Sequence, residues 1–525
     1  MKVKQAAISG RRHIGKSNIL KGTLILTMAG FTTRVIGFLY KIFLSKVMGA
    51  EWLGIYQLVF PVYGIAFTIY ATGVQTAISR LIAAEIGKKN NKNFGRILGL
   101  GLAISFSMAL ILSILVYKFS DTIALRFLME PRSASPLRIL AVVFPFCGIT
   151  SCINGYYYGL KRAGVPASTQ LLEQMIRVIV VYIAAFTVGN GNFQVTCEMA
   201  VLGLVIGEIA SCLYNFLSLF ITKSPKAMLY PGPNPNAESL KRKDIIKNIL
   251  SLSIPLSTNR LLINILHSIE AVLIPTMLRR SGLSTGEALS TYGILMGMSI
   301  PFIMFPTALT NSLAVLLLPT VSEAQAMDNK DVIGRTASTS IKYSLIIGIF
   351  STCIFLLFGK NLGLTIFHSE EAGNYLIILA WICPLIYLAT TLGSIINGLG
   401  KAHITFINSI LGTLAKILII ILMIPHKGIS GYLTALLIGQ LIITVMDSIY
   451  IIRNICFRFD AVNSILKPGI IVTMSGFMLK RIYEYLHKIT QIHQAVFLLL
   501  FCLLFCVVCT ILFIITDTIS KSDFK

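Results

Sequence analysis

Charged residues are scarce in this sequence. Only 13% of its 525 residues are charged, with 21 acidic and 45 basic side chains, whereas about a quarter of the residues of a soluble protein carry a charge. Hydrophobic residues make up 55% of the chain, and the mean hydropathy is +0.80. This composition excludes a soluble enzyme and is typical of a polytopic membrane protein.

Sequence signatures of catalysis are also missing. The chain contains no Walker A loop, no GxSxG elbow and no His/Cys cluster at metal-ligand spacing. Its ten cysteines lie mostly inside apolar runs, which favours a role in packing over a disulfide framework. We therefore expect no enzymatic activity, no catalytic residue, no bound metal and no cofactor.

Long apolar runs dominate what is present. About fourteen of them can cross a hydrocarbon core of about 30 Å, which predicts an all-α polytopic protein with about fourteen transmembrane helices. The runs lie at 20–46, 52–79, 95–118, 137–160, 170–189, 199–221, 249–277, 291–318, 338–358, 375–399, 406–425, 430–452, 468–486 and 494–516.

The basic residues predict the orientation of these helices. The net charge of +24 does not indicate a nucleic-acid partner, because the Lys and Arg side chains are scattered between apolar runs. With the N-terminus inside the cell, cytoplasmic segments collect about 28 of them and outer segments about 12, as the positive-inside rule requires. We expect a multi-pass protein of the cell membrane with both termini in the cytoplasm.

The sequence repeats itself at an offset of about 239 residues. Leu140–Ala141 followed by Pro145 recurs as Leu379–Ala380 followed by Pro384. The offset spans six helices, an even number, so the two halves have the same orientation in the membrane and form parallel repeats. Transporters of this design bind their substrate between the halves.

The repeat predicts a domain organisation with two six-helix lobes. The expected segments are a basic cytoplasmic N-terminus at 1–18, an N-terminal lobe at 19–221, a cytoplasmic linker at 222–248, a C-terminal lobe at 249–454, and two extra helices with a cytoplasmic tail at 455–525.

Charges inside the predicted spans are the candidate site residues, because a charge at the bilayer centre costs about 2.5–3.5 kcal/mol or more unless it has a partner or a wet cavity. Arg34 and Lys41 lie on one face of helix 1, about 10 Å apart along its axis. Helix 7 carries a second polar stripe, which includes Arg260, Asn264, His267 and Glu270. These two faces predict a shared cavity, in which Arg34, Lys41, Arg260 and Asn264 bind an anionic substrate.

Two further pairs of charges occupy equivalent positions in the halves. The offset carries Arg177 onto Lys416 and Glu208 onto Asp447. One interpretation is that Arg177 with Glu208, and Lys416 with Asp447, neutralise each other within a lobe. The other makes Glu208 or Asp447 a site for H⁺ or Na⁺ coupling, and Glu270 and His267 of helix 7 are further candidates for that role.

Several short motifs in order resemble a known family. The segments Thr33–Phe38, Gly49–Ala50, Leu53–Tyr56, Ala77–Arg80 and Leu317–Ser322 are similar to those of the stage V sporulation protein B family of polysaccharide-biosynthesis membrane proteins. That family is related to the lipid II flippases and to the multidrug and toxin extrusion exporters. The resemblance runs over nearly the whole chain.

The resemblance implies a V-shaped pair of lobes with two extra C-terminal helices. It also implies alternating access for an undecaprenyl-pyrophosphate-linked peptidoglycan or polysaccharide precursor, in cell-wall or spore-cortex synthesis. Arg34 matches the first cavity arginine of the lipid II flippases, but the second falls at Tyr40, next to Lys41. The arginine expected ahead of Pro301 falls near Met296.

The partners that follow are lipid II or a lipid-linked oligosaccharide, membrane lipids and, as candidates, cell-wall synthesis enzymes. Three alternative functions are a cation-coupled drug exporter, a membrane glycosyltransferase or polymerase acting on the same lipid, and a scaffold. The basic face of helix 1 argues against export of organic cations, and an enzyme would need an acid/base pair that the loops lack. Polar faces directed at a shared interior would be a costly way to build a scaffold.

Overall fold

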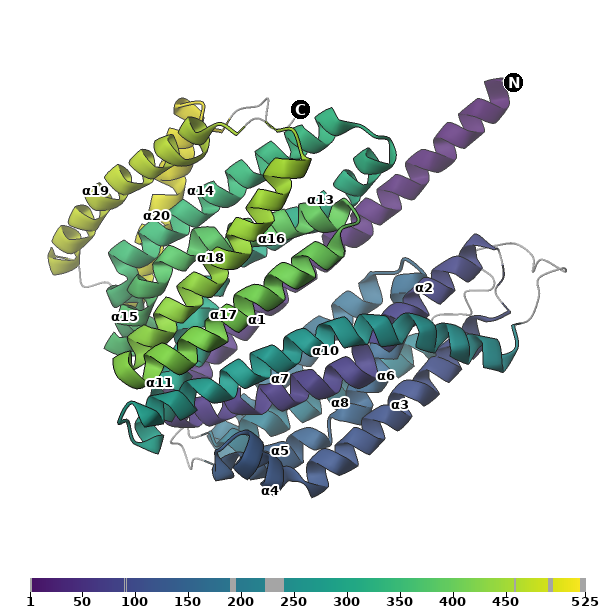
Figure 1. Ribbon diagram of the computed structural model, residues 1–525, viewed down its shortest axis with the longest axis horizontal. Coiled ribbons are helices and arrows are strands. Elements are labelled where there is room, and N and C mark those ends of the chain that lie inside the picture. The colour runs from purple at the N-terminus through teal and green to yellow at the C-terminus, as the bar shows by residue number, and fades with distance from the viewer. Residues whose placement is uncertain are drawn as a thin grey trace. The chain divides into compact units, whose positions relative to one another are not determined.

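The computed structural model describes residues 2–88, 90, 92–188, 195–221, 240–457, 459–489 and 494–519. Throughout these residues the secondary structure is helical, with no strand, and Figure 1 draws only coiled ribbons and connecting segments. Helices are the expected outcome for apolar runs, because in lipid each backbone N–H and C=O must be satisfied within its own segment. The fold is therefore all-α, as the sequence predicts.

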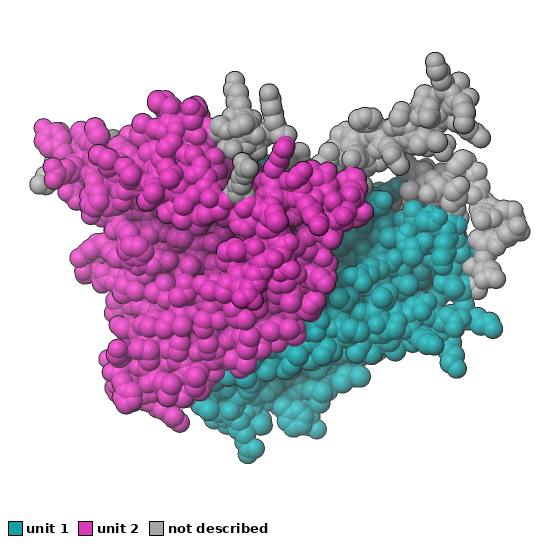
Figure 2. Space-filling view, turned by 45° about the horizontal axis from the view of Figure 1, so that its top comes forward, with its two compact units in different colours: residues 1–40, 55–272 teal, residues 41–54, 273–525 magenta. Residues whose placement is uncertain are grey.

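The chain divides into two compact units, which Figure 2 draws in different colours. Unit 1 contains residues 1–40 and 55–272, and unit 2 contains residues 41–54 and 273–525. The first helix, α1 (Lys2–Phe67), contributes to both units, and α10 (Arg242–Arg280) belongs to unit 1 up to residue 272. These boundaries differ from the predicted lobes at 19–221 and 249–454.

Unit 1 is built from ten further helical elements besides its parts of α1 and α10. They are η1 (Thr68–Thr72), α2 (Gly73–Gly87), α3 (Phe94–Lys118), α4 (Ser120–Thr122), η2 (Ile123–Phe127), η3 (Pro131–Ser133), α5 (Ala134–Ala141), α6 (Phe144–Gly159), α7 (Gly164–Val188) and α8 (Cys197–Ile221).

Unit 2 contains the remaining elements. They are α11 (Thr285–Gly293), η4 (Ile294–Ser299), α12 (Ile300–Met304), α13 (Thr307–Ala326), α14 (Lys330–Leu362), η5 (Gly363–Phe367), α15 (Glu370–Leu379), η6 (Ala380–Ile382), α16 (Cys383–Gly398), α17 (Ala402–Lys427), α18 (Ile429–Asn454), η7 (Val462–Leu466), α19 (Lys467–Ile489) and α20 (Gln494–Ile515).

Twelve helices of the described chain are long and apolar enough to cross a membrane, or 13 if the bent pair Pro131–Ala141 and Phe144–Gly159 forms one span. The first of them, Ile25–Gly87, has 63 residues and would reach about 95 Å as a straight helix, far more than one crossing needs. A kink at Gly49, with φ 76°, divides it. It therefore covers the first two predicted spans, and the count comes near the predicted fourteen.

One predicted span is displaced in the structure. The sequence places a helix at 291–318, but the apolar span is Thr285–Met304, and α13 begins only at Thr307. Pro306 explains the break, since proline has no N–H to continue the hydrogen-bond ladder. The predicted linker 222–248 and the tail end lie mostly outside the described residues, with the linker described only from residue 240.

The internal repeat is visible as matching hydrogen bonds. In unit 1 the hydroxyl of Ser113 donates to the carbonyl oxygen of Ala141 at 2.7 Å. In unit 2, 239 residues later, the hydroxyl of Thr352 donates to the carbonyl oxygen of Ala380 at 3.0 Å. The helices that follow these carbonyls, α6 and α16, have 16 residues each and are related by the same offset.

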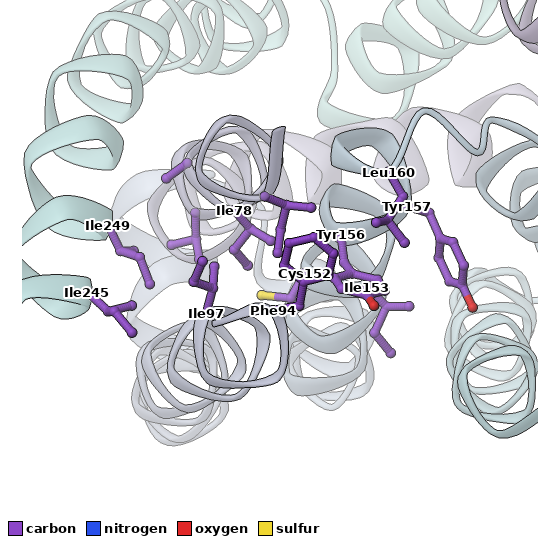
Figure 3. Packing of buried hydrophobic residues seen from close by; sticks show 13 residues of the cluster. Ile78, Phe94, Ile97, Cys152, Ile153, Tyr156, Tyr157, Leu160, Ile245 and Ile249 are labelled. Atoms are coloured by element: carbon purple, nitrogen blue, oxygen red, sulfur yellow. The ribbon is translucent and has the colours of Figure 1, made fainter. Parts of the chain in front are cut away.

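Each unit has its own apolar core. In unit 1, Ile78, Ile97, Ile153 and Ile249 bring side chains from α2, α3, α6 and α10 together, as Figure 3 shows. Unit 2 has a corresponding cluster on α13, α14, α16 and α18. Because lipid tails are as apolar as these side chains, the helices associate through close van der Waals packing more than through a hydrophobic driving force.

Contacts at glycines explain the unit boundaries. A Cβ on Gly54 would collide with the carbonyl of Leu289, and one on Gly293 with the carbonyl of Ala50, so residues 50–54 of α1 pack backbone to backbone on α11. A Cβ on Gly73 would come within 2.5 Å of the carbonyl oxygen of Ser253, which shows how closely α2 approaches α10. Helix α10 therefore packs with the first half of the chain, where the sequence predicted it to begin the second lobe.

Candidate functional site

Two cationic residues of α1, Arg34 and Lys41, differ in exposure. The side chain of Arg34 is exposed and that of Lys41 is half-buried. Neither makes a hydrogen bond or ion pair with the described part of the chain. Arg34 belongs to unit 1 and Lys41 to unit 2. Both are therefore cations inside a membrane span without a protein counterion among the described residues.

Arg260 lies near the middle of α10 and has the same character. Its side chain is exposed, and within the described ranges it has no hydrogen bond or ion pair. Glu270 is buried, and its carboxylate faces His267 on the same helix, with 3.4 Å between His267 Nδ1 and Glu270 Oε2.

Asn264, one turn after Arg260, anchors α10 to α1. Its Nδ2 donates to the carbonyl oxygen of Gly64 at 3.3 Å and to the hydroxyl of Thr68 at 2.5 Å. Ser268, one turn further, donates to the carbonyl oxygens of Asn264 at 2.7 Å and Pro61 at 3.3 Å. Thr68 also opens the π-helical turn η1, a departure from α-helical hydrogen bonding that is frequent at functional sites.

The charge partner of Arg177 differs from the expected one. Its Nη2 donates to the Glu173 carboxylate one turn earlier on α7, whereas the sequence paired it with Glu208. This spacing of four residues places both side chains on one face of the helix. Arg177 and Glu173 are nevertheless the charged groups that act on Glu208, which is buried on the neighbouring helix α8.

In unit 2, the buried carboxylate of Asp447 has an amide partner on the neighbouring helix. Its Oδ1 accepts from Nδ2 of Asn408 at 2.7 Å, and the carboxylate is buried between α17 and α18. Lys416 lies where the same two helices pack closely, since a Cβ on Gly439 would be 2.8 Å from the Cβ of Lys416.

The structure thus sorts the predicted site residues by unit and by exposure. Unit 1 holds Arg34, Arg177, Glu208, Arg260, Asn264, His267 and Glu270, and unit 2 holds Lys41, Lys416 and Asp447. The three acids are only 3–7% exposed, whereas Arg34 and Arg260 are exposed. Among the predicted site residues, the accessible permanent charge is therefore cationic.

Sequence reasoning missed several residues of this region. Glu173 was overlooked although its spacing from Arg177 is a recognisable helix signal. Thr68, whose hydroxyl accepts from Asn264, carries no sequence signal of its own, because hydroxyls are common in apolar helices and their contacts depend on the folded structure. Within the described part of the chain, no three His, Cys, Asp or Glu side chains are grouped so that they could hold a metal ion.

These features define a class of protein. The chain is a helical membrane protein of two related units, each crossing the membrane several times, with cations exposed inside its spans. It belongs to the polysaccharide biosynthesis protein family, which matches residues 19–325. The MatE family matches residues 274–422.

Relatives agree with this membership. Stage V sporulation protein B of Bacillus subtilis (strain 168) is 26% identical over 476 residues, covering 90% of this chain and 91% of its own. Lipid II flippase MurJ of the same organism is 20% identical over 462 residues, covering 84% of each chain. A solved lipid II flippase MurJ in an inward closed conformation superposes with a TM-score of 0.66 at 15% identity, covering 95% of this chain and 100% of that one. The protein is a membrane transporter of the flippase class.

Proposed function

We propose that this protein translocates a lipid-linked precursor of peptidoglycan or another polysaccharide, and that Arg34 and Arg260 bind the pyrophosphate of its headgroup. A pyrophosphate cannot enter hydrocarbon without replacing its water, whereas the lipid tail can stay in the membrane throughout. A flippase for such a lipid needs cations at membrane depth that are accessible and not already neutralised.

One observation carries the proposal: Arg34 and Arg260 are exposed inside spans and have no counterion among the described residues. An arginine left against lipid would cost about 2.5–3.5 kcal/mol or more. A bound pyrophosphate removes this cost, because guanidinium groups donate two parallel hydrogen bonds to phosphate oxygens. Lys41 adds a mobile positive charge that can follow the headgroup as it moves.

Asn264 completes the proposed site through its position. Its amide is held by Gly64 and Thr68, so the rotation of α10 about its axis is fixed. Arg260 lies one turn away on the same helix and is thereby presented in a defined direction. A pre-oriented cation loses less side-chain entropy on binding than a freely rotating one.

The names of the relatives support a lipid-linked substrate, since lipid II is the substrate named for MurJ. Export of organic cations, the alternative to which the MatE match corresponds, would favour anionic and aromatic residues in the cavity. Glu208, Glu270 and Asp447 are buried instead. A glycosyltransferase acting on the same lipid would need an accessible acid/base pair, for which these buried carboxylates are equally unsuited.

In this proposal the protein works in the cell membrane, with both termini in the cytoplasm, where the precursor is made. It exposes the headgroup site to each side of the membrane in turn and forms no covalent intermediate. Its partners are the lipid-linked precursor, the surrounding lipids and, in the cell, the enzymes that supply and consume that precursor.

Binding is the direct test of this proposal. Purified protein in nanodiscs is titrated with undecaprenyl pyrophosphate and, for comparison, with undecaprenyl monophosphate. Arg260→Gln should weaken pyrophosphate binding by about 1.5–3 kcal/mol, the value of a charge-assisted hydrogen bond, which is roughly tenfold to 150-fold in Kd. If Arg260→Gln binds each of the two lipids as tightly as wild type does, Arg260 does not bind the headgroup.

A further inference from the structure

Glu208 lies in a buried polar cluster of unit 1 that the proposed headgroup site does not use. Glu208 belongs to α8 and is only 7% exposed, because other helices pack over its side chain. A Cβ on Gly207 would lie 2.8 Å from the carbonyl oxygen of Glu173, so α7 and α8 are in backbone contact here. The titratable and charged groups that act on Glu208 are Glu173 and Arg177 of α7, Cys147 of α6, Tyr63 of α1, Tyr70 of η1 and Cys212 of α8.

The cluster contains two acids and one permanent cation. Arg177 donates through Nη2 to Glu173, which neutralises that carboxylate. The contacts of Glu208 are with neutral groups: the thiol of Cys147, and the hydroxyl of Ser211 at 3.4 Å from Oε2. If both acids were ionised, the buried cluster would carry one uncompensated negative charge, which a dry interior strongly disfavours.

Two hydrogen-bond donors of the cluster have no acceptor within the described residues and could donate to a second carboxylate. The Nε of Arg177 has no hydrogen-bond partner in the described part of the chain. The hydroxyl of Tyr70 also lacks one among these residues, although its side chain is fully buried and acts on Glu208. Buried donors normally have partners. Both are therefore available when Glu208 carries a negative charge.

The geometry points to Glu208 as a proton-binding site of the transporter. With its proton bound, the cluster is neutral, and Arg177 serves Glu173 alone. When the proton leaves to water, Glu208 becomes a carboxylate that competes with Glu173 for Arg177. When Arg177 moves from Glu173 to Glu208, the contact between α7 and α8 changes. The two helices therefore have one arrangement with the proton bound and another without it.

A proton suits this cluster better than a metal ion. The guanidinium of Arg177 repels a cation placed near Glu208. The thiol of Cys147 is a soft donor, whereas Na⁺ and other hard cations prefer carboxylate, carbonyl and water oxygens. A proton needs only the carboxylate oxygen and an acceptor for its hydrogen bond.

The cluster connects to the proposed headgroup site through adjacent residues of α1. The hydroxyl of the half-buried Tyr63 lies 3.4 Å from Sγ of Cys147, which faces Glu208. The next residue, Gly64, accepts from Asn264 of α10. A movement of α1 at Tyr63 is therefore transmitted to the helix that carries Arg260. This coupling rests on the proposed function, whereas proton binding by Glu208 does not.

Infrared spectroscopy of the purified full-length protein tests the proton site without any transport. A protonated buried carboxyl gives a C=O stretching band that disappears when the acid ionises. We expect this band in wild type at neutral pH, its loss in Glu208→Gln, and no change on adding Na⁺ at constant pH. A spectrum identical in wild type and Glu208→Gln overturns the proposal, and a band removed by Na⁺ reassigns the site to that ion.

Two further variants keep the test decisive if Glu208→Gln folds poorly. Glu173→Gln frees Arg177 for Glu208, so the protonated-carboxyl band at neutral pH should weaken, an effect that a merely structural role of Glu208 would not produce. An unchanged band in Glu173→Gln contradicts the proposal. Glu130→Gln is the matched control: Glu130 is also buried but pairs with Arg132 at 2.7 Å, so its replacement should leave the band intact.

A transport assay distinguishes the proposed translocation of a lipid headgroup from the proposed proton site at Glu208. In proteoliposomes, an imposed proton gradient should accelerate headgroup translocation by wild type, while Glu208→Gln should translocate at a rate that no longer responds to the gradient. If wild type moves no lipid while the infrared band behaves as expected, the proposed function fails and the proton site stands. If both proteins respond equally to the gradient, the coupling role of Glu208 is refuted.

Discussion

The side-chain amide of Asn264 donates to the hydroxyl of Thr68 at 2.5 Å and joins the middle of α10 to the π-helical turn that follows α1. The same amide reaches the carbonyl of Gly64, so two successive turns of one segment hold a single side chain. Because residues one turn apart share a helix face, this anchor also sets the direction of Arg260. A structural contact thereby sets the direction of the cation that we propose to bind the headgroup.

The first prediction concerns this anchor. Asn264→Ala should lower the thermal stability of the detergent-purified protein, since each lost hydrogen bond contributes about 0.5–1.5 kcal/mol and nothing replaces it. It should also weaken binding of undecaprenyl pyrophosphate although Asn264 carries no charge. Asn259→Ala is the control, because Asn259 lies on the same helix, is exposed and has no partner within the described residues. Equal melting temperatures of the two variants would count against the anchor.

The second prediction concerns the close packing of paired helices in both units. A Cβ on Gly207 would lie 2.8 Å from the carbonyl oxygen of Glu173, and one on Gly412 would lie 2.8 Å from that of Gly439. Gly207→Ala and Gly412→Ala should each destabilise the protein by about 1–3 kcal/mol through overpacking.

Gly99→Ala is the control for this test, because it should not lower the stability of the protein. A Cβ on Gly99 would meet nothing within 4 Å, so the substitution should be neutral or stabilising, by up to about 1 kcal/mol from helix propensity. Thermal unfolding followed by circular dichroism distinguishes the three variants. Stabilisation by Gly207→Ala would show that α7 and α8 are not in backbone contact.

The third prediction concerns topology. With both termini in the cytoplasm, the segment after the second span is cytoplasmic and the segment after the third is outside. In a protein whose exposed Cys456 is replaced by serine, Lys88→Cys should react with a membrane-impermeant maleimide only after the cells are opened, whereas Asp121→Cys should react in intact cells. The reverse pattern would invert the orientation that the basic residues predict.

Much of the fold follows from the sequence because the membrane allows few alternatives. Apolar runs of about 20 residues must be helices, and matching residues at an offset of 239 indicate two related halves. The hydrogen bonds of Ser113 and Thr352 confirm that the halves share structure at this offset. The unit boundaries were not predictable in the same way, since they depend on the close approach of Gly54 to Leu289, which no hydropathy pattern records.

The site was predictable to a lesser degree. Charges inside spans identify candidate residues because they are costly, and Arg34 and Arg260 are indeed exposed. The partner of each charge depends on side-chain directions, so the expected pairing of Arg177 with Glu208 gave way to Glu173 on the same helix. Whether the substrate is a pyrophosphate-linked precursor remains the proposal that transport must test.

That test is a flipping assay in proteoliposomes, with purified lipid II and an undecaprenyl-pyrophosphate oligosaccharide as substrates. Wild type should move the headgroup of at least one of them across the membrane. Arg34→Ala, expressed at the same level, should slow this by about a hundredfold, in keeping with the loss of a bidentate charge-assisted contact. Arg138→Ala should be as active as wild type, because Arg138 is occupied by an exposed ion pair with Asp121. Full activity of Arg34→Ala, or a folded wild type that moves organic cations and neither lipid, would contradict the account.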